Sequence, residues 1–240
     1  MVTRQQRARQ TRQALVHSAS QEFERHGYAE TKLTDISARA GVSAGALHFH
    51  FENKAAVATA VEQAATRILR AAVLRAYRQP RPALQRLVDS SHVLAQLFRE
   101  ESAVRAGFQL SLDNLHRDRP NLLHGWQTCV RRLLTEADLE GELLSGLPLP
   151  DMASTVVGAT MGFETLARDD WEWLSLERIA GFWRLLLPRL ATPEALGGLE
   201  PYGLEPTDKL RSDFDDYAEP VNSTPIQDRS ERDEVAGGKA

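Results

Sequence analysis

The chain has 240 residues, a net charge of −4 and a hydrophobic content of 42%, which indicates a globular protein that can bury a core. Its single cysteine, Cys129, excludes an internal disulfide and is typical of a protein from a reducing cytoplasm. No apolar run reaches the roughly 20 residues of a membrane span, and no apolar segment behind the polar N-terminus indicates a secretion signal.

Charge is distributed unevenly along the sequence. Residues 1–54 carry eight Lys and Arg against five Asp and Glu, whereas residues 55–196 carry 16 against 17 and residues 197–240 carry five against 11. The overall negative charge argues against a nucleic-acid-binding protein. A basic first segment nevertheless suits a local DNA contact, because attraction to phosphate acts over about a Debye length.

Residues 34–54 predict two short helices separated by a tight turn. The first runs from Thr34 or Asp35 to Ala40, Gly41 ends it, and Ser43 can cap a second helix over 44–51. This is the sequence form of a helix-turn-helix, which lays its second helix in a DNA major groove. Spacing alone also allows a three-helix bundle without a DNA role.

The remaining sequence is helical in pattern. Apolar residues recur at spacings of three and four, and no segment alternates with period two, so we expect an all-α protein. The other expected helices are 10–27, 54–77, 83–99, 104–115, 120–137, 151–168 and 175–190. We expect Thr31 or Thr34, Asn53, Asp151 and Ser175 to cap the helices that follow them.

Composition divides the chain into three parts. Residues 1–54 form the basic three-helix segment, residues 55–196 form a larger helical domain, and residues 197–240 form an acidic tail that we expect to be disordered. Within the larger domain, Leu147 to Pro150 is expected to be a linker. The tail could serve as an interaction segment, although an inert extension is the simpler interpretation.

No set of residues in the sequence predicts catalysis, a metal site or a cofactor. There is no nucleotide-binding loop, no paired-cysteine site and no nucleophile–base set, and the adjacent acidic pairs 169–170 and 215–216 fall in expected loops. His48 and His50 are two positions apart on a helix and point about 200° apart, so they do not suit one metal ion. A small helical enzyme and a scaffold protein remain alternatives of other classes.

Residues 10–55 resemble the TetR family of bacterial repressors. The motifs that carry the resemblance are Gly27-Tyr28, Thr31, Asp35-Ile36, Ala40-Gly41-Val42-Ser43, Gly45-Ala46-Leu47, His50-Phe51 and Lys54. They define the turn, the second helix and the cap of the next helix together, and so favour a DNA-binding unit over a generic bundle.

As far as about residue 193, the chain is similar to the γ-butyrolactone receptors of that family. The motifs concerned are Gly45-Ala46-Leu47 with Phe49-His50-Phe51, Val104-Arg105-Ala106-Gly107, Trp126, Gly141-Glu142-Leu143, Val157-Gly158-Ala159, Leu176-Glu177-Arg178, Trp183 and Leu187-Pro188. The resemblance implies a cytoplasmic, nucleoid-associated homodimeric repressor of antibiotic-pathway or regulatory genes. A small diffusible lactone or furan-like signal would release it from a palindromic operator. The alternative is a repressor that answers to an antibiotic, a biosynthetic intermediate or an efflux substrate.

The resemblance and the helix positions together predict a DNA-binding set. Its members are Arg4, Arg7, Thr34, Ser43, Ala44, Gly45, His48, His50 and Lys54. We expect Arg4, Arg7 and Arg9 to form a flexible arm, and Lys54 to meet a phosphate at a helix N-terminus. The family usually has Tyr in place of His48 and often a basic residue in place of Ala44, so base preferences do not transfer directly.

Residues 55–196 would then bind the ligand and form the dimer. The expected ligand-binding residues are Gln63, Phe108, Leu112, Trp126, Thr160 and Trp183. The expected dimer interface, an intersubunit four-helix bundle of 151–168 and 175–190, contains Gly158, Gly162, Ile179, Trp183 and Leu187. Trp126 as a core residue and Thr160 bonded to its own helix are the structural alternatives. The helix 54–77 links the two domains, and we expect it to swing on ligand binding.

Overall fold

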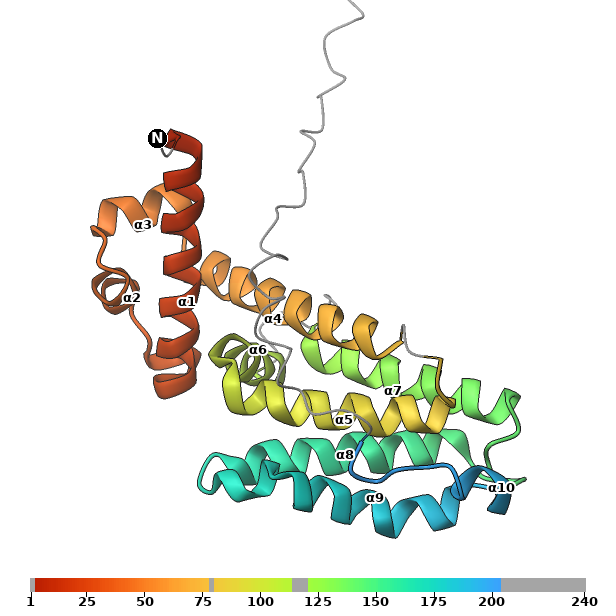
Figure 1. Ribbon diagram of the computed structural model, residues 1–240. Helices are drawn as coiled ribbons and strands as arrows, with labels where there is room; N and C mark the ends of the chain where they lie inside the picture. Colours follow the sequence, from red (N-terminus) through yellow and green to blue (C-terminus); the bar gives the residue numbers. More distant parts are fainter. Residues whose placement is uncertain (1–2, 78–79, 114–120, 204–240) are drawn as a thin grey trace, which may run out of the picture.

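The computed structural model describes residues 3–77, 80–113 and 121–203, and all its regular secondary structure is helical apart from one isolated β-bridge (Figure 1). The elements are α1 Arg4–Glu30, α2 Leu33–Arg39, α3 Ala44–His50, α4 Lys54–Tyr77, α5 Ala83–Glu100, α6 Ser102–Leu112, α7 Leu122–Leu139, α8 Leu149–Ala167, η1 Trp171–Leu174, α9 Leu176–Leu190 and α10 Pro193–Leu196. The predicted all-α class is confirmed. None of the described helices is long and apolar enough to cross a membrane.

Helices α1 to α3 form a small unit at one end of the molecule, and α4 leads from it into the larger helical body (Figure 1). Ile36, Leu47 and Phe51 are buried in the core of this unit with Leu15 and Phe23 of α1. Leu33, Ala40 and Val42 pack against the same core, as the sequence pattern predicts. The periodicity therefore placed the apolar faces of these short helices correctly.

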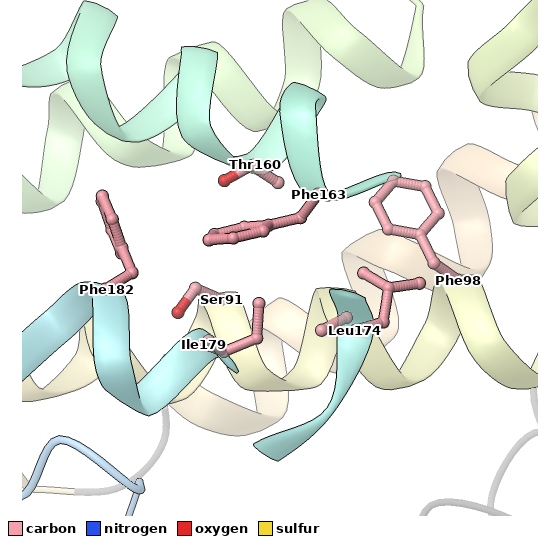
Figure 2. A pocket seen from close by; sticks show the side chains of 8 residues that line it. Ser91, Phe98, Thr160, Phe163, Leu174, Ile179 and Phe182 are labelled. Carbon is pink, nitrogen blue, oxygen red and sulfur yellow. The ribbon is translucent and has the colours of Figure 1, made fainter. Parts of the chain in front are cut away.

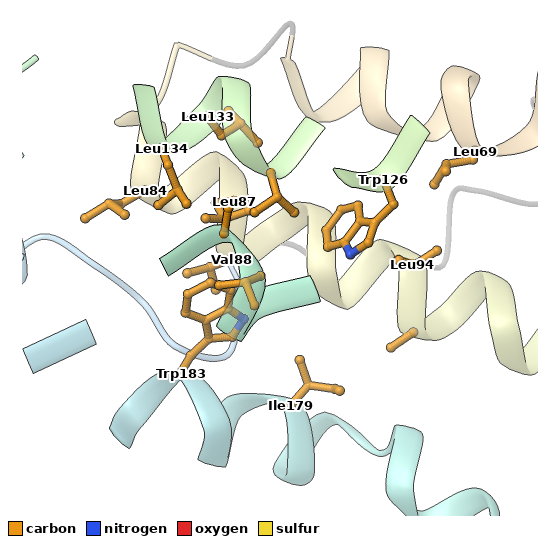
Figure 3. Close-up of a cluster of buried hydrophobic side chains, with 14 of the residues drawn as sticks. Leu69, Leu84, Leu87, Val88, Leu94, Trp126, Leu133, Leu134, Ile179 and Trp183 are labelled. Atoms are coloured by element: carbon orange, nitrogen blue, oxygen red, sulfur yellow. The ribbon is translucent and has the colours of Figure 1, made fainter. Parts of the chain in front are cut away.

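The larger body has a second core, in which α8 and α9 lie on the side away from α4 (Figure 1). Figure 3 shows Trp126 of α7 and Trp183 of α9 among leucines of α5 and α7. The indole nitrogen of Trp183 donates a 2.6 Å hydrogen bond to Ser91 Oγ. Without this acceptor the buried N–H would be unpaired.

Glu142, between α7 and α8, caps the N-terminus of α5. Its two carboxylate oxygens accept 2.8 Å hydrogen bonds from the backbone N–H groups of Ala83 and Leu84. The residue before α5 is Pro82, whose side chain cannot cap a helix, so a carboxylate 58 to 59 residues away does so. Burial raises the pKa of Glu142, and these backbone hydrogen bonds oppose that shift.

The N-terminus corrects one prediction. The expected flexible arm is helical: α1 begins at Arg4, and Thr3 and Gln6 form a capping box at its start. Gly27 has a φ of 71° and non-helical geometry, so the regular helix ends there as predicted, and a further helical turn follows as far as Glu30. The residue before α2 is Lys32, so neither Thr31 nor Thr34 caps that helix; the Thr31 hydroxyl instead donates to the carbonyls of Glu22 and Gly27.

Two further boundaries differ from expectation. The predicted linker 147–150 ends inside a helix, because α8 begins at Leu149. Pro150 lies in the first turn, where a backbone N–H has no acceptor within the helix, so proline loses no hydrogen bond there. Helix α7 begins at Leu122 with Asn121 as its cap, and the predicted start at Pro120 lies outside the described residues.

The C-terminal segment 197–203 is folded rather than part of a disordered tail. Glu200 N–H donates to the side-chain oxygen of Gln85 at 2.7 Å, and the Gln85 amide donates back to the Glu200 carbonyl at 3.2 Å. His92 Nε2 lies 2.8 Å from the carbonyl oxygen of Pro201. The acidic remainder, residues 204–240, lies outside the described residues, so its predicted disorder stays a prediction.

Candidate DNA-binding surface and ligand cavity

Helix α3 presents its polar and small residues outward. Leu47 is buried beneath it, whereas Ala44, Gly45 and His48 are exposed. Ser43 Oγ accepts a 3.1 Å hydrogen bond from Ala46 N–H, which caps the helix and leaves the hydroxyl hydrogen available to a further acceptor. Such a surface can approach a nucleic-acid groove closely, since small side chains keep the helix backbone near the bases.

Basic and hydroxyl groups lie beside this helix on the neighbouring elements. Arg4, Arg7 and Arg9 are all exposed along the first turns of α1. Thr34 is exposed in the first turn of α2, and its hydroxyl lies 3.4 Å from a carboxylate oxygen of Asp35. The predicted DNA-binding arginines are therefore carried on a rigid helix instead of a flexible arm.

Lys54 occupies a different position from the one predicted. Its ammonium donates hydrogen bonds of 2.8, 3.0 and 3.0 Å to the carbonyl oxygens of Tyr28, Ala29 and Thr31, and it lies 4.6 Å from the centre of the Tyr28 ring. All three ammonium hydrogens are thereby engaged at the end of α1. The cation joins α4 to the C-terminal end of α1, and a phosphate contact, which stays a prediction, would have to share the ammonium with these carbonyls.

His50, at the end of α3, lies near a basic group that the sequence pattern did not single out. Burial, with a smaller contribution from the charge of Arg12, lowers the pKa of the His50 imidazole. The Arg12 guanidinium lies 5.0 Å from the centre of the Phe51 ring. Burial and the same Arg12 charge lower the pKa of Arg67 on α4. The two guanidinium groups of Arg12 and Arg67, beside the imidazole of His50, create a local preference for an anion.

Phe49 is a surface residue that sequence reasoning left without a role. Its side chain is 79% exposed on α3, and its ring makes an edge contact with His50 at 5.2 Å between ring centres. An exposed aromatic ring on a helix that enters a groove suits contact with a thymine methyl group. The signal in the sequence that could have identified Phe49 is its place directly after His48 on the outward side of this helix.

A small apolar cavity lies between α5, α8, η1 and α9 (Figure 2). Its lining includes Phe98, Phe163 and Phe182 with the hydroxyl-bearing Ser91 and Thr160. Its volume is about 10 Å³, which is room for about one water molecule. Thr160 Oγ1 donates a 2.9 Å hydrogen bond to the carbonyl of Val156 on its own helix, so its oxygen can still accept one.

The predicted ligand-binding residues are scattered. Thr160 lines the cavity, but Phe108, Trp126 and Trp183 are buried in the core and do not line it. Leu112 is 39% exposed on α6. Gln63 is exposed on α4, which contradicts its predicted place in a pocket, and Trp183 is already paired with Ser91.

Trp126 has an unusual environment for a core tryptophan. It is 1% exposed, and no described residue accepts a hydrogen bond from its indole Nε1. A buried donor without an acceptor costs roughly 1–3 kcal/mol, so such a group indicates strain, a bound water or a ligand. The ring lies between α7 and α5, beside Leu94 (Figure 3).

The predicted dimer residues separate into two groups. Ile179, Trp183 and Leu187 are buried in the core of their own chain, so their assignment to a dimer interface is wrong. Helical periodicity identified an apolar stripe of α9 but could not tell which partner that stripe meets. Gly158 is exposed and Gly162 half-buried on α8, and a Cβ at either would meet nothing within 4 Å.

Comparison with known proteins identifies the family. The family described as "Bacterial regulatory proteins, tetR family" matches residues 15–61, which cover α2, α3 and parts of α1 and α4. The chain is 29% identical over 203 residues to the A-factor receptor protein of Streptomyces griseus, covering 84% of this chain and 71% of that protein.

Two crystal structures extend the likeness to the whole helical body. A γ-butyrolactone receptor (ArpA-like protein) superposes with a TM-score of 0.71 at 25% identity, covering 88% of this chain and 98% of that one. The regulator TylP of Streptomyces fradiae is 33% identical with a TM-score of 0.62, covering 89% and 92%. The chain therefore belongs to the TetR family, whose members are DNA-binding transcriptional regulators and not enzymes.

Proposed function

We propose that this protein is a homodimeric repressor that binds a palindromic operator and is released by a small γ-butyrolactone or furan-like signal. We further infer that it acts in the cytoplasm, at the nucleoid, and controls genes of antibiotic biosynthesis. The observation that carries the ligand part is the buried indole Nε1 of Trp126, which has no acceptor among the described residues. The likeness to a γ-butyrolactone receptor over most of the chain supports the same class of ligand.

For DNA recognition, α3 enters the major groove with its exposed face forward. Gly45 and Ala44 allow close approach, while His48 and Phe49 reach base edges or the thymine methyl group. Ser43 donates its hydroxyl to a phosphate at the start of the helix. Two copies related by a two-fold axis would read half-sites about 34–36 Å, or a multiple of that distance, apart.

Helices α8 and α9 supply the dimer interface in this proposal. Leu185 is 81% exposed on α9, and Leu176 of the same helix is also exposed. Gly158 and Gly162 on α8 leave open space at their α-carbons, which suits close approach by a partner helix. We therefore replace the predicted Ile179, Trp183 and Leu187 by this outward face, with the second copy as its occupant.

The ligand would enter beside the second core. A lactone carbonyl would accept a hydrogen bond from Trp126 Nε1, and its apolar chain would occupy the cavity that Phe163 and Phe182 border. That cavity has to widen to hold such a molecule, because its present volume is about 10 Å³. Binding thus favours a second conformation, and it releases DNA by its difference in affinity between the two.

A gel-shift titration tests the proposal. We expect the full chain to retard promoter DNA from beside its own gene in a salt-sensitive manner, and a synthetic alkyl γ-butyrolactone to reverse the shift. Trp126→Phe removes the indole N–H together with part of the ring, so it should retain DNA binding and raise the lactone concentration needed for release by at least about tenfold, the value of one buried hydrogen bond.

The outcomes separate the alternatives. Normal release of the Trp126→Phe variant would return Trp126 to a core role. Release by a hydrophobic antibiotic, with no response to the lactone, would favour the antibiotic-responsive alternative. Absence of a salt-sensitive shift on any promoter near the gene would reject the repressor itself.

A further inference from the structure

Helix α6 belongs to both hydrophobic cores. Ala106 and Leu110 are buried with the DNA-binding helices, whereas Val104 and Phe108 are buried in the core of the larger body. Between them, Gly107 lies so close to α4 that an added Cβ would come 2.5 Å from the Cβ of Ala65. Close-packed interiors transmit displacement instead of absorbing it, so a shift of α6 reaches both cores.

Arg105 of α6 joins this junction to the DNA-binding end. Its Nε and Nη2 donate to the two carboxylate oxygens of Glu24 on α1, at 2.7 and 3.3 Å. Its Nη1 donates to the carbonyl oxygens of Phe98 and Arg99, at 2.6 and 3.1 Å, in the last turn of α5. One guanidinium therefore caps α5 and at the same time holds α1. The side chains of Arg105 and Glu24 are both partly shielded from water.

The same junction borders the ligand cavity. A cleft of about 160 Å³ lies beside Arg105, and its lining includes Glu24, Gln109 and Trp171. Phe98 and Leu174 line both this cleft and the apolar cavity of Figure 2. Phe98 thus borders the cavity with its ring and holds Arg105 with its carbonyl oxygen.

The cleft also contains a second carboxylate that can attract the guanidinium. Glu164 of α8 is buried, borders the cleft and accepts hydrogen bonds from Arg168 at 3.1 to 3.3 Å. Glu164 lies one turn after Thr160, which lines the apolar cavity. Burial raises the pKa of Glu164, and the charges of Arg168 and Arg105 oppose that shift. Arg105 therefore shares this cleft with two carboxylates, Glu24 on the DNA-binding end, which it holds, and Glu164 on the ligand side.

We propose that Arg105 is the positioning residue that couples the ligand cavity to the DNA-binding helices. With the cavity closed, Arg105 holds Glu24 and keeps α1 in the orientation that binds DNA. When a ligand widens the cavity, Phe98 moves, its carbonyl draws Arg105 away from Glu24, and the guanidinium turns toward Glu164. This inference rests on the proposed repressor function and names the contact that regulates it.

A double-mutant cycle tests the coupling. Glu24→Gln leaves the cap of α5 intact and loosens only the grip on α1, whereas Arg105→Gln removes both. We expect each variant to bind promoter DNA about tenfold more weakly than the parent protein. Glu24→Gln should keep the thermal stability of the parent, and the double variant should bind no more weakly than Arg105→Gln. The controls Glu30→Gln on α1 and Arg131→Gln on α7 make the same substitutions at exposed residues. Both controls should bind promoter DNA normally. Wild-type affinity of Glu24→Gln, or fully additive effects, would overturn the proposal.

Spin-label distances provide a readout that needs no DNA. Nitroxides on cysteines placed at the exposed positions Gln13 and Thr135, with Cys129→Ser, report the distance between α1 and α7 when labelled chains are diluted with unlabelled ones. We expect one narrow distribution in the parent protein and a broad or shifted one in Glu24→Gln. An unchanged distribution would reject the clamp even if the repressor function holds. Failure of the parent protein to bind DNA, with a broadened distribution in the variant, would reject the repressor function alone.

Discussion

At the scale of single residues, the side chains that join elements have a role that their local sequence does not reveal. Lys54 stands in the first turn of α4, where a cation is unfavourable for the helix dipole, yet its ammonium satisfies three carbonyl oxygens at the end of α1. Glu22 acts similarly, because its buried carboxylate holds Arg39 of α2 against α1. These contacts hold α4 and α2 against α1.

Lys54→Met should lower the free energy of unfolding by about 1–2 kcal/mol, because it removes the donors to the carbonyls of Tyr28, Ala29 and Thr31. Urea unfolding followed by circular dichroism measures this loss, and Lys32→Met, at an exposed cation of the same unit, is the matched control. Unchanged stability with a reduced salt dependence of DNA binding would restore the phosphate role.

We expect His50 to make DNA binding dependent on pH. Because burial and Arg12 lower its pKa in the free protein, the imidazole is mostly neutral at pH 7, and a nearby phosphate would raise that pKa. At a pH between the pKa of His50 in the free protein and its pKa in the complex, DNA binding takes up a proton. The affinity for DNA should therefore rise as the pH falls through the pKa of the complex, and become constant below the pKa of the free protein.

Fluorescence anisotropy of labelled operator DNA between pH 8 and pH 5.5 measures this dependence. His50→Gln should flatten the profile, whereas His124→Gln, an exposed histidine on α7, should not. A profile that is identical in the parent and in His50→Gln would remove His50 from the phosphate contacts.

At the scale of elements, α9 and α6 each have two faces with different surroundings. The face of α9 that contains Ile179, Trp183 and Leu187 closes the core of its own chain, and the opposite face exposes Leu185. Helix α6 divides its apolar residues between two cores in the same way. The allocation of faces determines which helices can meet a second copy and which transmit a movement within one chain.

Leu185→Glu should convert the proposed dimer into a monomer without unfolding it, because a charged side chain on an interface costs several kcal/mol while the same side chain on a free surface costs little. Sedimentation velocity measures the mass of the species, and thermal melting checks the fold. Leu139→Glu, at an equally exposed leucine of α7, is the control. A Leu185→Glu variant that remains a dimer would place the interface elsewhere.

At the scale of the whole molecule, the chain after α9 folds back onto the body. Gln85 is buried and exchanges two hydrogen bonds with the backbone of Glu200, and Leu199 packs against the second core. The Tyr202 ring lies 5.8 Å from the Arg184 guanidinium. The folded body therefore extends at least to Gly203.

Two truncations distinguish the folded segment from the acidic remainder. A chain that ends at residue 203 should unfold like the full protein. A chain that ends at residue 197 should lose about 2–4 kcal/mol in its free energy of unfolding, since the buried side-chain oxygen of Gln85 loses its donor, Glu200 N–H, and Leu199 is removed. Urea titration compares the three proteins, and equal stability of both truncations would show that this segment contributes nothing.

The sequence by itself determined what depends on neighbouring residues. The caps Ser43 and Asn53, each within three residues of the N–H groups that they accept from, and the turn at Gly41, with a φ of 68°, are local features, and α4 has the predicted bounds 54–77. The family resemblance rests on the same short stretch. Local hydrogen bonding and helical periodicity are sufficient there because each partner lies within one or two turns.

The tertiary structure alone decided which partner each face and charge meets. Arg105 reaches Glu24 across 81 residues, Trp183 reaches Ser91 across 92, and Gln85 reaches Glu200 across 115. A periodic pattern identifies an apolar stripe but does not identify what covers it, so the dimer residues on α9, the role of Lys54 and the folded segment 197–203 could not be predicted. These contacts depend on the arrangement of whole helices, and that arrangement also places Arg105 between the ligand cavity and the DNA-binding end.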